Sequence, residues 1–499
     1  MKHFDHIVVG SGASGLTATL LLALQGRKVL LLEKAPQVGG SLARFRRGGL
    51  PFDTGFHFTG GLTEHGLLSR MLRALGLADE VEPQFMAADK AHRFVFESVG
   101  RTIDLPCGLS AMRQKLKADF PGEQVAVERY FDLVEKVCAQ TGTMDLSRLT
   151  EPSARLDEEY VSLKDVLDGL TGNALLKGVL SGLSMCYGVK PSEMSFASHS
   201  RVCYDLYEST ARFKAGGETL IEAFQRHFRG LAVETACSCW IEKFDDIQND
   251  QAGKALLNTG EEVAFGSVLL TIHPRQILQL LPPEQISKAF VERVMAFEPS
   301  LGFFTLFGTL DGGSHDDTVS SITSLFPLTD FEALLDPAYR GEQALVIVGN
   351  EEAVGGVRRR TATILEPAFP QAMEPWQDTF TGRRPPAYQA YKQERVAAIL
   401  KHLVRYDARY GEHFQTTDSA SVLTYRDYLH SFDGSAYGIK QKLGQYNLIG
   451  RLPVRNLFAA GQSALLPGVA GAMMSSFIVV RSMVGRDAFN RFMGTRLCN

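Results

Sequence analysis

The sequence predicts an α/β protein in which a parallel-sheet domain is interrupted by a second, α+β domain. Two observations lead to this prediction. Residues 6–34 read as strand, glycine turn, helix and strand, which is how a parallel sheet with crossover helices begins. Strand patterns return in the middle of the chain and again near its end, after stretches of helical periodicity, so the first sheet is expected to be assembled from separate segments.

The length of the chain indicates how many domains to expect, and its charge argues against one class of function. A chain of 499 residues is too long for one ordinary core, so about two or three domains are expected. The apolar fraction of 45% is that of a globular protein. The formal net charge is −4 and the Lys and Arg residues are scattered, so the sequence shows no basic face and nucleic-acid binding is not expected.

Cysteine usage and the N-terminus indicate a cytoplasmic protein. The seven cysteines are odd in number and dispersed, which argues against a disulfide framework and for a reducing compartment. Cys237 and Cys239 are predicted to share one strand face in the core; no second pair accompanies them, so no metal site is predicted. No signal peptide is visible, because residues 1–10 enter a strand almost at once. The uncharged run 457–480 is interrupted by Gln462, a proline and several glycines, so it is not predicted to span a membrane.

The glycines of residues 6–34 form a nucleotide-binding turn. Gly10, Gly12 and Gly15 make the pattern GxGxxG directly after the first strand. Gly10 permits the tight turn, Gly12 lets the backbone approach a pyrophosphate, and Gly15 lets the helix pack against the strand. The N-terminus of the following helix favours the negative charge of the phosphates. Glu33, at the end of the second strand, is placed to accept hydrogen bonds from an adenosine ribose.

The residues after the second strand favour FAD over NAD. Gly39 and Gly40 resemble the GG loop of the flavoproteins with two dinucleotide-binding domains. Such a loop adds backbone N–H groups without side-chain bulk, which suits the longer diphosphate path of a flavin. Arg44 either adds positive charge there or belongs with Arg46 and Arg47 to a solvated hairpin, and the sequence leaves both possibilities open.

The stretch FDTGFHFTGG, residues 52–61, is predicted to lie beside the same cofactor. Read with the period of a strand, it places phenylalanines on one face and Asp53, Gly55 and His57 on the other. In the flavoproteins just named, the segment after the GG loop runs back beside the cofactor. The polar face is therefore expected to approach the flavin, and the phenylalanine face the core. His57 is then a candidate for proton transfer, with a core histidine as the alternative.

Further segments are predicted to complete the cofactor domain. A glycine turn and a helix are expected over 213–228, and strands over 231–244 and 261–274, around a polar insert. A strand over 454–462 then leads into a helix over 467–484. The N-terminus of that helix would direct its partial positive charge at the flavin pyrimidine ring.

The predicted domains are therefore discontinuous in sequence. Residues 1–85, 205–285 and 415–499 are assigned to the FAD-binding domain. Residues 86–204 and 286–414 carry helical patterns without a cluster of chemistry-bearing residues, and they are assigned to a substrate-binding domain. The fold class is thus α/β, with a Rossmann-like FAD-binding domain of the two-dinucleotide-binding-domain flavoprotein type interleaved with an α+β substrate domain.

Several segments together resemble the FAD-dependent phytoene desaturase and carotenoid isomerase superfamily, and within it the retinol saturase branch. They are residues 39–61, 187–207, 213–217, 435–444 and 456–473, and the resemblance covers nearly the whole chain. The chain departs from the usual pattern at Gln462 and Ser463, where other members often carry an acidic residue. It also departs at Ser238, where the superfamily usually has a valine whose backbone contacts the adenine.

The resemblance implies redox chemistry at carbon–carbon bonds. The reaction would be saturation, desaturation or isomerisation of a long apolar polyene or isoprenoid such as a retinoid or carotenoid, with saturation preferred because of the branch that the chain resembles. FAD would carry the chemistry, while the protein excludes water and holds the geometry. An apolar polyene resides in lipid, so peripheral contact with a membrane is expected. The sequence gives neither the direction of the reaction nor the electron donor or acceptor.

The site residues follow from the motifs and the resemblance. The predicted FAD-binding residues are Gly10, Ser11, Gly12, Ala13, Ser14, Gly15, Glu33, Lys34, Gly39, Gly40, Ser41, Arg44, Gly55, Ser238, Gly461, Gln462, Gly468, Val469, Ala470 and Gly471. The candidates for proton transfer are His57, His199 and Tyr437. For His199 the alternative is plain helix packing, and for Tyr437 it is a buried tyrosine with a hydrogen-bonded hydroxyl.

Two other functions are compatible with the same scaffold. One is a flavin amine oxidase, for which the sequence gives no signal of its own. The other is a non-catalytic carrier of a prenyl or lipid chain, like the Rab GDP-dissociation inhibitors. The intact glycine motifs and Glu33 favour a working cofactor site over such a carrier.

Overall fold

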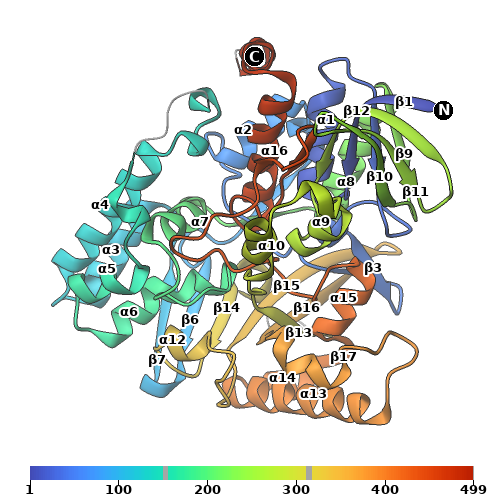
Figure 1. Ribbon diagram of the computed structural model, residues 1–499. Coiled ribbons are helices and arrows are strands. Elements are labelled where there is room, and N and C mark those ends of the chain that lie inside the picture. Colours follow the sequence, from blue (N-terminus) through green and yellow to red (C-terminus); the bar gives the residue numbers. More distant parts are fainter. Residues whose placement is uncertain (150–154, 311–316, 498–499) are drawn as a thin grey trace.

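Two β-sheets organise the chain in the computed structural model, which describes residues 1–149, 155–310 and 317–497 (Figure 1). The first sheet has the order β10-β11-β12-β1-β2-β9, with β19 beside β12 and β18 beside β19. Its strands are β1 (Lys2–Val9), β2 (Val29–Leu32), β9 (Val233–Ala236), β10 (Ile241–Gln248), β11 (Gln251–Leu257), β12 (Glu262–Leu270), β18 (Gly450–Arg451) and β19 (Leu457–Ala459). The run β9-β2-β1-β12-β19 is parallel throughout, which confirms the predicted α/β class.

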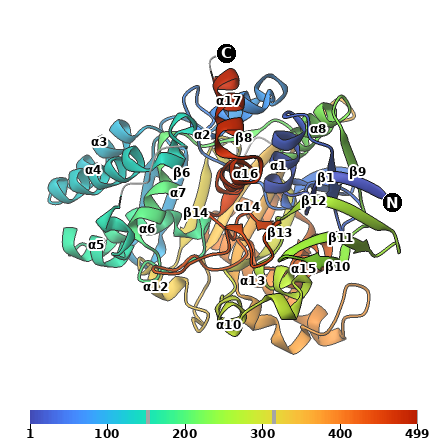
Figure 2. The ribbon, with the colours of Figure 1, turned by 45° about the horizontal axis from the view of Figure 1, so that its top comes forward.

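Helices from distant parts of the sequence cover one face of this sheet. They are α1 (Ala13–Ala23), α2 (Leu67–Leu75), α8 (Gly217–Phe228), α16 (Gly468–Val484) and α17 (Arg486–Leu497). Figures 1 and 2 show α16 directly beside α1. Their contact is held by the Ser14 and Ser476 hydroxyls, which are 2.7 Å apart in the buried interface. The helices α9 (Pro274–Leu280) and α10 (Lys288–Met295) pack on the other face with the β10–β11 hairpin.

The second sheet has seven strands in the order β17-β13-β16-β15-β14-β6-β7. They are β6 (His92–Phe96), β7 (Arg101–Leu105), β13 (Gly302–Leu310), β14 (Ile322–Phe326), β15 (Leu345–Val354), β16 (Val357–Ala368) and β17 (Phe414–Ala420). The pairing is antiparallel except between β14 and β6. This sheet belongs to the segments predicted as the substrate domain, although β17 runs past the predicted boundary at residue 414.

Most remaining helices flank the second sheet. On the β6 side, at the left of Figure 1, lie α3 (Leu109–Asp119), α4 (Gln124–Gln140), α5 (Leu163–Leu170), α6 (Ala174–Ser181) and α7 (Phe196–Glu208). At the bottom lie α13 (Pro386–Tyr406) and α14 (Arg409–His413). Shorter elements are α11 (Asp317–Ser320), α12 (Phe331–Leu334), α15 (Val422–Leu429), β3 (Arg44–Arg47), β4 (Leu50–Asp53), β5 (Pro83–Phe85) and β8 (Ala211–Phe213).

Several local predictions can be compared with these elements. The helices expected over 213–228 and 467–484 are confirmed as α8 and α16. The polar insert at 245–254 was expected to separate strands, but it is itself part of the β10–β11 hairpin. The hairpin lies at the edge of the sheet, where alternate residues face solvent, so polar side chains are compatible with strand structure there.

The uncharged run 457–480 is split between two elements of the core. It supplies β19, a turn and most of α16, whose inner residues such as Met473 and Phe477 are fully buried. In the part of the chain that the structure describes, no helix combines the length and apolar character needed to cross a membrane.

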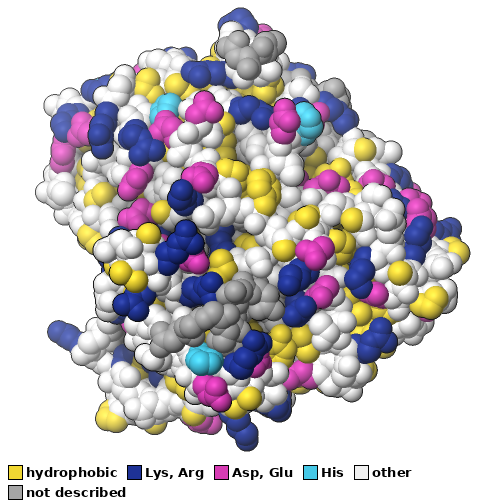
Figure 3. All heavy atoms as spheres, turned by 180° about the vertical axis from the view of Figure 1, so that it is seen from behind, with side chains coloured by type: hydrophobic (Ala, Val, Ile, Leu, Met, Phe, Trp, Pro, Cys, Tyr) yellow, Lys and Arg dark blue, Asp and Glu magenta, His cyan; other side chains and the backbone are white. Residues whose placement is uncertain are grey.

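Acidic and basic side chains are mixed over the face of the molecule seen in Figure 3. Neither sign forms a broad continuous area on that face. This distribution agrees with the scattered charges of the sequence and gives no support for a nucleic-acid surface on that side.

Candidate functional site

A cavity of about 620 Å³ lies between the first sheet and the second sheet. At one end it is lined by the glycine turn after β1 and the N-termini of α1 and α16. At the other end it reaches Phe303 on β13, Val346 on β15 and Leu365 on β16. The same cavity therefore joins the dinucleotide motif to an apolar wall of the second sheet.

The glycine turn has the conformation that a dinucleotide site requires. Gly10 has a φ of 92°, and a Cβ atom on Gly15 would lie 1.8 Å from the Gly10 carbonyl oxygen. A Cβ atom on Gly12, in contrast, would have no neighbour among the described residues within 4 Å. Gly15 is thus required for helix packing, whereas Gly12 keeps open the part of the cavity where a diphosphate would lie.

Two helix N-termini point their unpaired backbone N–H groups toward this end of the cavity. Within the described residues, neither α1 nor α16 has a side-chain cap or an acidic residue in its first turn. The first turns line the cavity with Ala13, Ser14 and, on α16, Gly468–Gly471. Uncapped N-termini favour an anion, so the residues present fit the diphosphate of FAD.

Glu33 holds the glycine turn in place. Its Oε2 atom accepts hydrogen bonds from the Ser11 N–H at 2.9 Å and the Ser11 hydroxyl at 2.5 Å. Its Oε1 atom accepts from the Ala35 N–H at 2.8 Å. The carboxylate also lines the cavity, together with Lys34. Besides its predicted role in binding a ribose, Glu33 therefore stabilises the glycine turn, which the motif did not predict.

The GG loop packs directly onto the glycine turn. The Gly39 N–H donates to the Ser11 carbonyl at 3.1 Å, and a Cβ atom on Gly40 would lie 3.2 Å from the Gly12 Cα atom. Gly40 and Ser41 line the cavity, while Gly39 lies behind them against Ile221. Gly39 thus shapes the loop rather than the cavity surface.

Arg44 lies outside the cavity, contrary to the prediction that it adds charge near the cofactor. Its Nε atom is 2.8 Å from the Asp53 Oδ1 atom, and a second nitrogen pairs with Glu352 of β15. The Arg44 side chain is only 3% exposed, so the solvated-hairpin alternative is also wrong for this residue. It is correct for Arg46, which is exposed on β3.

The 52–61 stretch is not a two-faced strand. Strand β4 ends at Asp53, and residues 54–60 all line the cavity in irregular backbone. Asp53 does not reach the cavity because Arg44 binds it. Phe56 packs against Phe213 with ring centroids 5.2 Å apart. The strand period failed here because the chain leaves the sheet before Gly55.

His57 remains a cavity residue. It belongs to the 54–60 lining, and it has no hydrogen bond to any other described residue. Burial lowers the pKa of His57 to about 4, so its imidazole is neutral near pH 7. A neutral imidazole can both accept and donate a proton, which keeps His57 a proton-transfer candidate.

His199 lies in the core beside the second sheet and not at the cavity, which contradicts its proposed catalytic role. Its Nε2 atom is 2.7 Å from the Tyr130 hydroxyl, and its Nδ1 atom is 2.9 Å from the Tyr187 hydroxyl. The residue is fully buried, and burial lowers its pKa to about 3. Helix packing, the alternative for His199, is therefore what the structure shows.

Tyr437 lines the cavity with a hydroxyl that is already engaged. The hydroxyl donates to the Met185 carbonyl oxygen at 3.0 Å, and the ring meets Phe303 edge to face. Burial raises its pKa well above the ordinary value of a tyrosine. Tyr437 is thus part of the cavity wall, and its hydroxyl proton is engaged in a hydrogen bond to a backbone oxygen.

The segment between β9 and β10 corrects two predictions. Ser238 has a φ of 52°, is exposed, and does not line the cavity, whereas Cys239 does. The Cys239 N–H donates to the Glu33 carbonyl at 2.9 Å, which brings that residue beside the predicted ribose site. The turn at Ser238 also separates the cysteines, because Cys237 is exposed while Cys239 is buried.

The C-terminal segment contributes to the cavity at the predicted positions. The lining includes Gly461, Gln462, Gly468, Val469, Ala470 and Gly471. The Gln462 side chain donates to the Ala436 carbonyl at 3.3 Å, and the Ser475 hydroxyl accepts from the Gly461 N–H at 2.8 Å. The Gln462 amide therefore connects this segment to the loop at Ala436, which also lines the cavity.

Some cavity residues could not be found by sequence motifs. Asp205 and Arg201 reach the cavity from α7, and His273 reaches it from the start of α9. They come from two segments far apart in the sequence, and no motif links the two. An isolated carboxylate in a helix is most often a surface residue, so nothing in the sequence marks Asp205.

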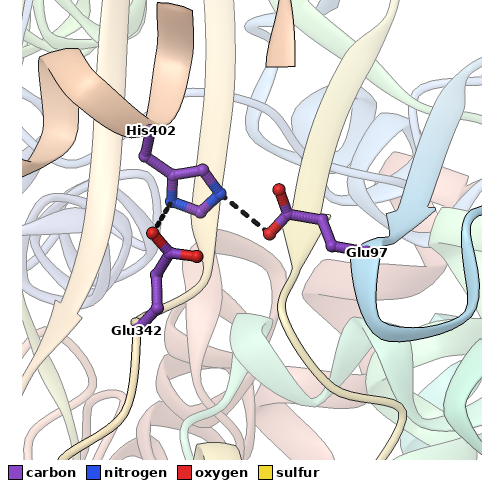
Figure 4. A group of neighbouring side chains, drawn as sticks. All are labelled: Glu97, Glu342 and His402. Carbon is purple, nitrogen blue, oxygen red and sulfur yellow. Dashed lines mark hydrogen bonds and ion pairs between the residues drawn. The ribbon is translucent and has the colours of Figure 1, made fainter. Parts of the chain in front are cut away.

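A cluster of metal-ligand residue types lies away from the cavity (Figure 4). The His402 Nε2 atom is 2.9 Å from Glu97, and its Nδ1 atom is 3.8 Å from Glu342. Arg405 pairs with Glu97 at 3.0 Å and with Glu342 at 2.5 Å. Because the Arg405 guanidinium pairs with both carboxylates, the cluster is an ion-pair network that ties α13 to the second sheet.

Comparisons with known proteins agree with this site. Residues 8–75 match the family described as an NAD(P)-binding Rossmann-like domain. The chain is 26% identical to all-trans-retinol 13,14-reductase of Macaca fascicularis over 556 residues, covering 99% of this chain and 88% of that protein. It is 30% identical to chloroplastic prolycopene isomerase of Daucus carota over 162 residues, covering 30% of this chain and 24% of that protein.

Solved structures share the fold. An oxidoreductase from Methanosarcina mazei has a TM-score of 0.65 at 15% identity, covering 97% of this chain and 100% of that chain. Putrescine oxidase bound to putrescine has a TM-score of 0.64 at 16% identity, covering 97% of this chain and 98% of that chain.

The fold, the site and these comparisons define an FAD-dependent oxidoreductase. Within that class, the chain is similar to all-trans-retinol 13,14-reductase over nearly its whole length and to prolycopene isomerase over about a third of it, in agreement with the resemblance of its motifs.

Proposed function

We propose that the chain reduces, desaturates or isomerises a carbon–carbon double-bond system in a long apolar polyene of the retinoid or carotenoid class, with reduction preferred. The observation that carries this proposal is the continuous cavity from the glycine turn to the apolar wall at Phe303, Val346 and Leu365. Full-length similarity to all-trans-retinol 13,14-reductase supports the substrate class and the preferred direction.

FAD would be held by residues from three segments of the first domain. They are Gly10 to Ser14 with Glu33 and Lys34, then Gly40, Ser41 and Gly55, and finally Gly461, Gln462 and Gly468 to Gly471. When bound, FAD supplies the acceptor or donor of a hydride. The N-terminus of α16 would stabilise negative charge on the ring system, because the helix begins at the cavity without an acidic residue in its first turn.

The apolar residues on the other side of the cavity would exclude water and orient the polyene. Phe58, Met185, Cys186 and Phe303 would supply an apolar wall around the reacting bond. His57 would hold or move the proton that accompanies the hydride, because its neutral imidazole faces the cavity and has no partner among the described residues. Tyr437 would position the substrate by its ring, since its hydroxyl is bound to a backbone oxygen.

The electron partner and the membrane contact are parts of the same proposal. The sequence has one GxGxxG pattern, so a separate donor or acceptor would restore the oxidation state of the cofactor between turnovers. An apolar polyene is delivered from lipid, so the protein would bind membranes peripherally. Flotation with phosphatidylcholine liposomes checks the second statement, and protein that stays at the bottom of the gradient contradicts it.

A spectrum of the purified protein is the first test. We expect a flavin spectrum which, after anaerobic reduction, returns to the oxidised form on addition of all-trans-retinol or a carotenoid. Mass spectrometry should then find a product two hydrogens heavier than the substrate. Reduction of the oxidised protein by the same polyene would instead establish a desaturase.

Two outcomes would replace the proposal. Hydrogen peroxide released with amines such as putrescine would indicate an amine oxidase, the activity named for one protein of the same fold. A colourless protein that does not rebind added FAD would indicate a lipid carrier. The carrier outcome would contradict the open space at Gly12 as a diphosphate site.

A further inference from the structure

Asp205 on α7 lines the cavity, and its carboxylate has no partner among the residues that the structure describes. Arg201, Val202, Asp205 and Leu206 all line the cavity, and this spacing places them on one stripe of α7. The Asp205 backbone carbonyl accepts from the Ser209 N–H at 3.0 Å, but its carboxylate has no hydrogen bond or ion pair with the described residues. The opposite side of α7 packs into the core through residues such as His199 and Cys203.

The nearest cation on the helix is already occupied. The Arg201 Nε atom donates to the Thr141 hydroxyl at 3.0 Å, and a second nitrogen pairs with Glu159. Glu208, one turn further on, accepts from the Leu109 N–H at 3.3 Å and does not line the cavity. Asp205 is thus left as a lone acceptor, and burial, followed by the charge of Glu208, raises its pKa to about 6.

Two glycines let the 52–61 stretch pass close to Asp205, Gly60 against its backbone and Gly61 against its carboxylate. A Cβ atom on Gly60 would lie 2.3 Å from the Asp205 carbonyl carbon. A Cβ atom on Gly61 would lie 2.9 Å from the Asp205 Oδ2 atom. The same stretch carries His57 at the cavity, so it runs between the proposed proton-transfer residue and Asp205.

We infer that Asp205 binds the polar end of the substrate and selects a polyene alcohol. This inference rests on the proposed function and names the substrate class within it. An ionised carboxylate only accepts hydrogen bonds, so a terminal hydroxyl satisfies it, whereas an aldehyde or ester offers no donor. A polyene carboxylic acid would place a second negative charge beside it in a site of low dielectric constant.

The test is equilibrium binding to the oxidised holoenzyme, measured by equilibrium dialysis in dim light at pH 7.5. The probes are all-trans-retinol, all-trans-retinal and all-trans-retinoic acid, which share one skeleton and differ at the polar end. We expect retinol to bind about 10- to 100-fold more tightly than retinal, the range for one hydrogen bond to a charged acceptor. Retinoic acid should bind most weakly of the three.

Three variants separate this role from a general effect on the fold. Asp205→Leu should lose the preference for retinol over retinal, and Asp205→Asn should retain part of it because the amide oxygen still accepts. Asp205→Asn should also bind retinoic acid more tightly than the wild type does. Glu208→Gln removes a charge from the same helix outside the cavity and should leave the preference unchanged.

The outcomes separate the role of Asp205 from the proposed function. If the wild type binds the retinoids and Asp205→Leu keeps the preference for retinol, the role of Asp205 is wrong while the proposed function stands. If retinylamine binds the wild type more tightly than retinol through Asp205, the selected head group is an amine and the inference is overturned. If the flavin-loaded wild type binds none of the retinoids and no carotenoid, the proposed function fails, and the role of Asp205 fails with it.

Discussion

The Arg44 Nε atom lies 2.8 Å from the Asp53 Oδ1 atom, and only 3% and 11% of the two side chains are exposed. Glu352 of β15 completes the contact from the second sheet. Burial raises the pKa of Asp53 to about 6 against the opposing effect of Arg44. The ion pair therefore links the β3–β4 hairpin, which leads into the cavity segment 54–60, to the second sheet.

Removing the cation of this contact should destabilise the protein. Arg44→Met would remove the cation that contacts both buried carboxylates, and breaking a buried ion pair in this way typically costs about 3–5 kcal/mol. Urea denaturation of the purified protein measures the loss, with Arg46→Met on the same hairpin as the exposed control. Adding Asp53→Asn and Glu352→Gln to Arg44→Met should restore part of the stability. Equal stability of the two single variants would contradict the structural role of Arg44.

Gly12→Ala should weaken FAD binding without unfolding the protein. The added methyl group meets no described atom within 4 Å, so it would project into the space assigned to the diphosphate. We expect the dissociation constant for FAD to rise at least about tenfold, the equivalent of about 1.4 kcal/mol, while the melting temperature of the cofactor-free protein stays the same. Gly169→Ala, on exposed helix α5, is the matched control. Unchanged affinity for FAD would place the diphosphate elsewhere.

Gly15→Ala should behave differently from Gly12→Ala. Its Cβ atom would lie 1.8 Å from the Gly10 carbonyl oxygen, so α1 could not pack as it does. We expect the cofactor-free protein to lose stability as well as FAD affinity, which thermal unfolding with and without FAD would show. A variant as stable as the wild type would mean that the turn adapts without cost.

Substitutions of His57 and His199 should have different effects, the first on catalysis and the second on stability. His57→Gln is expected to lower turnover by about 10²- to 10⁴-fold with FAD still bound, as for loss of a general acid or base. His199→Gln is expected to cost about 1–3 kcal/mol of stability, because the hydroxyls of Tyr130 and Tyr187 lose a buried partner. Single-turnover rates and urea denaturation measure the two effects. A His199→Gln variant that folds normally but is inactive would reverse the assignment.

Acid should destabilise the protein through its buried histidines. Burial lowers the pKa of His6, His57, His92 and His273 to about 4 and that of His199 to about 3. The unfolded chain protonates these groups near pH 6.5, so the free energy of unfolding falls as the pH drops from about 6.5 toward 4. For His92, which is 3% exposed, the loss between pH 7 and pH 5 is about 2 kcal/mol.

Replacing one of these histidines tests the sign of that effect. His92→Gln should reduce the difference in unfolding free energy between pH 7 and pH 5, whereas His65→Gln, at an exposed position, should not. Chemical denaturation at the two pH values gives the comparison. A pH dependence that is the same in both variants would mean that His92 also becomes protonated in the folded state.

The sequence by itself determined the parts that depend on local chemistry. The GxGxxG turn, Glu33, the Gly39–Gly40 loop and the glycine start of α16 each need particular residues at fixed spacing, so their positions and their place at the cavity could be predicted. The α/β class followed from the same periodicities. The resemblance to the superfamily rested on these motifs together with segments spread along nearly the whole chain.

Only the tertiary structure decided which side chains meet. Arg44 and His199 are residue types suited to a cofactor site. Arg44 instead pairs with Glu352, which is more than 300 residues away, and His199 lies against the Tyr130 hydroxyl in the core. The strand period of 52–61 failed because β4 ends where Asp53 is bound. Asp205 reached the cavity because α7 crosses the 60–61 glycines. Contacts between distant segments set the protonation and accessibility of these groups, and no local pattern records them.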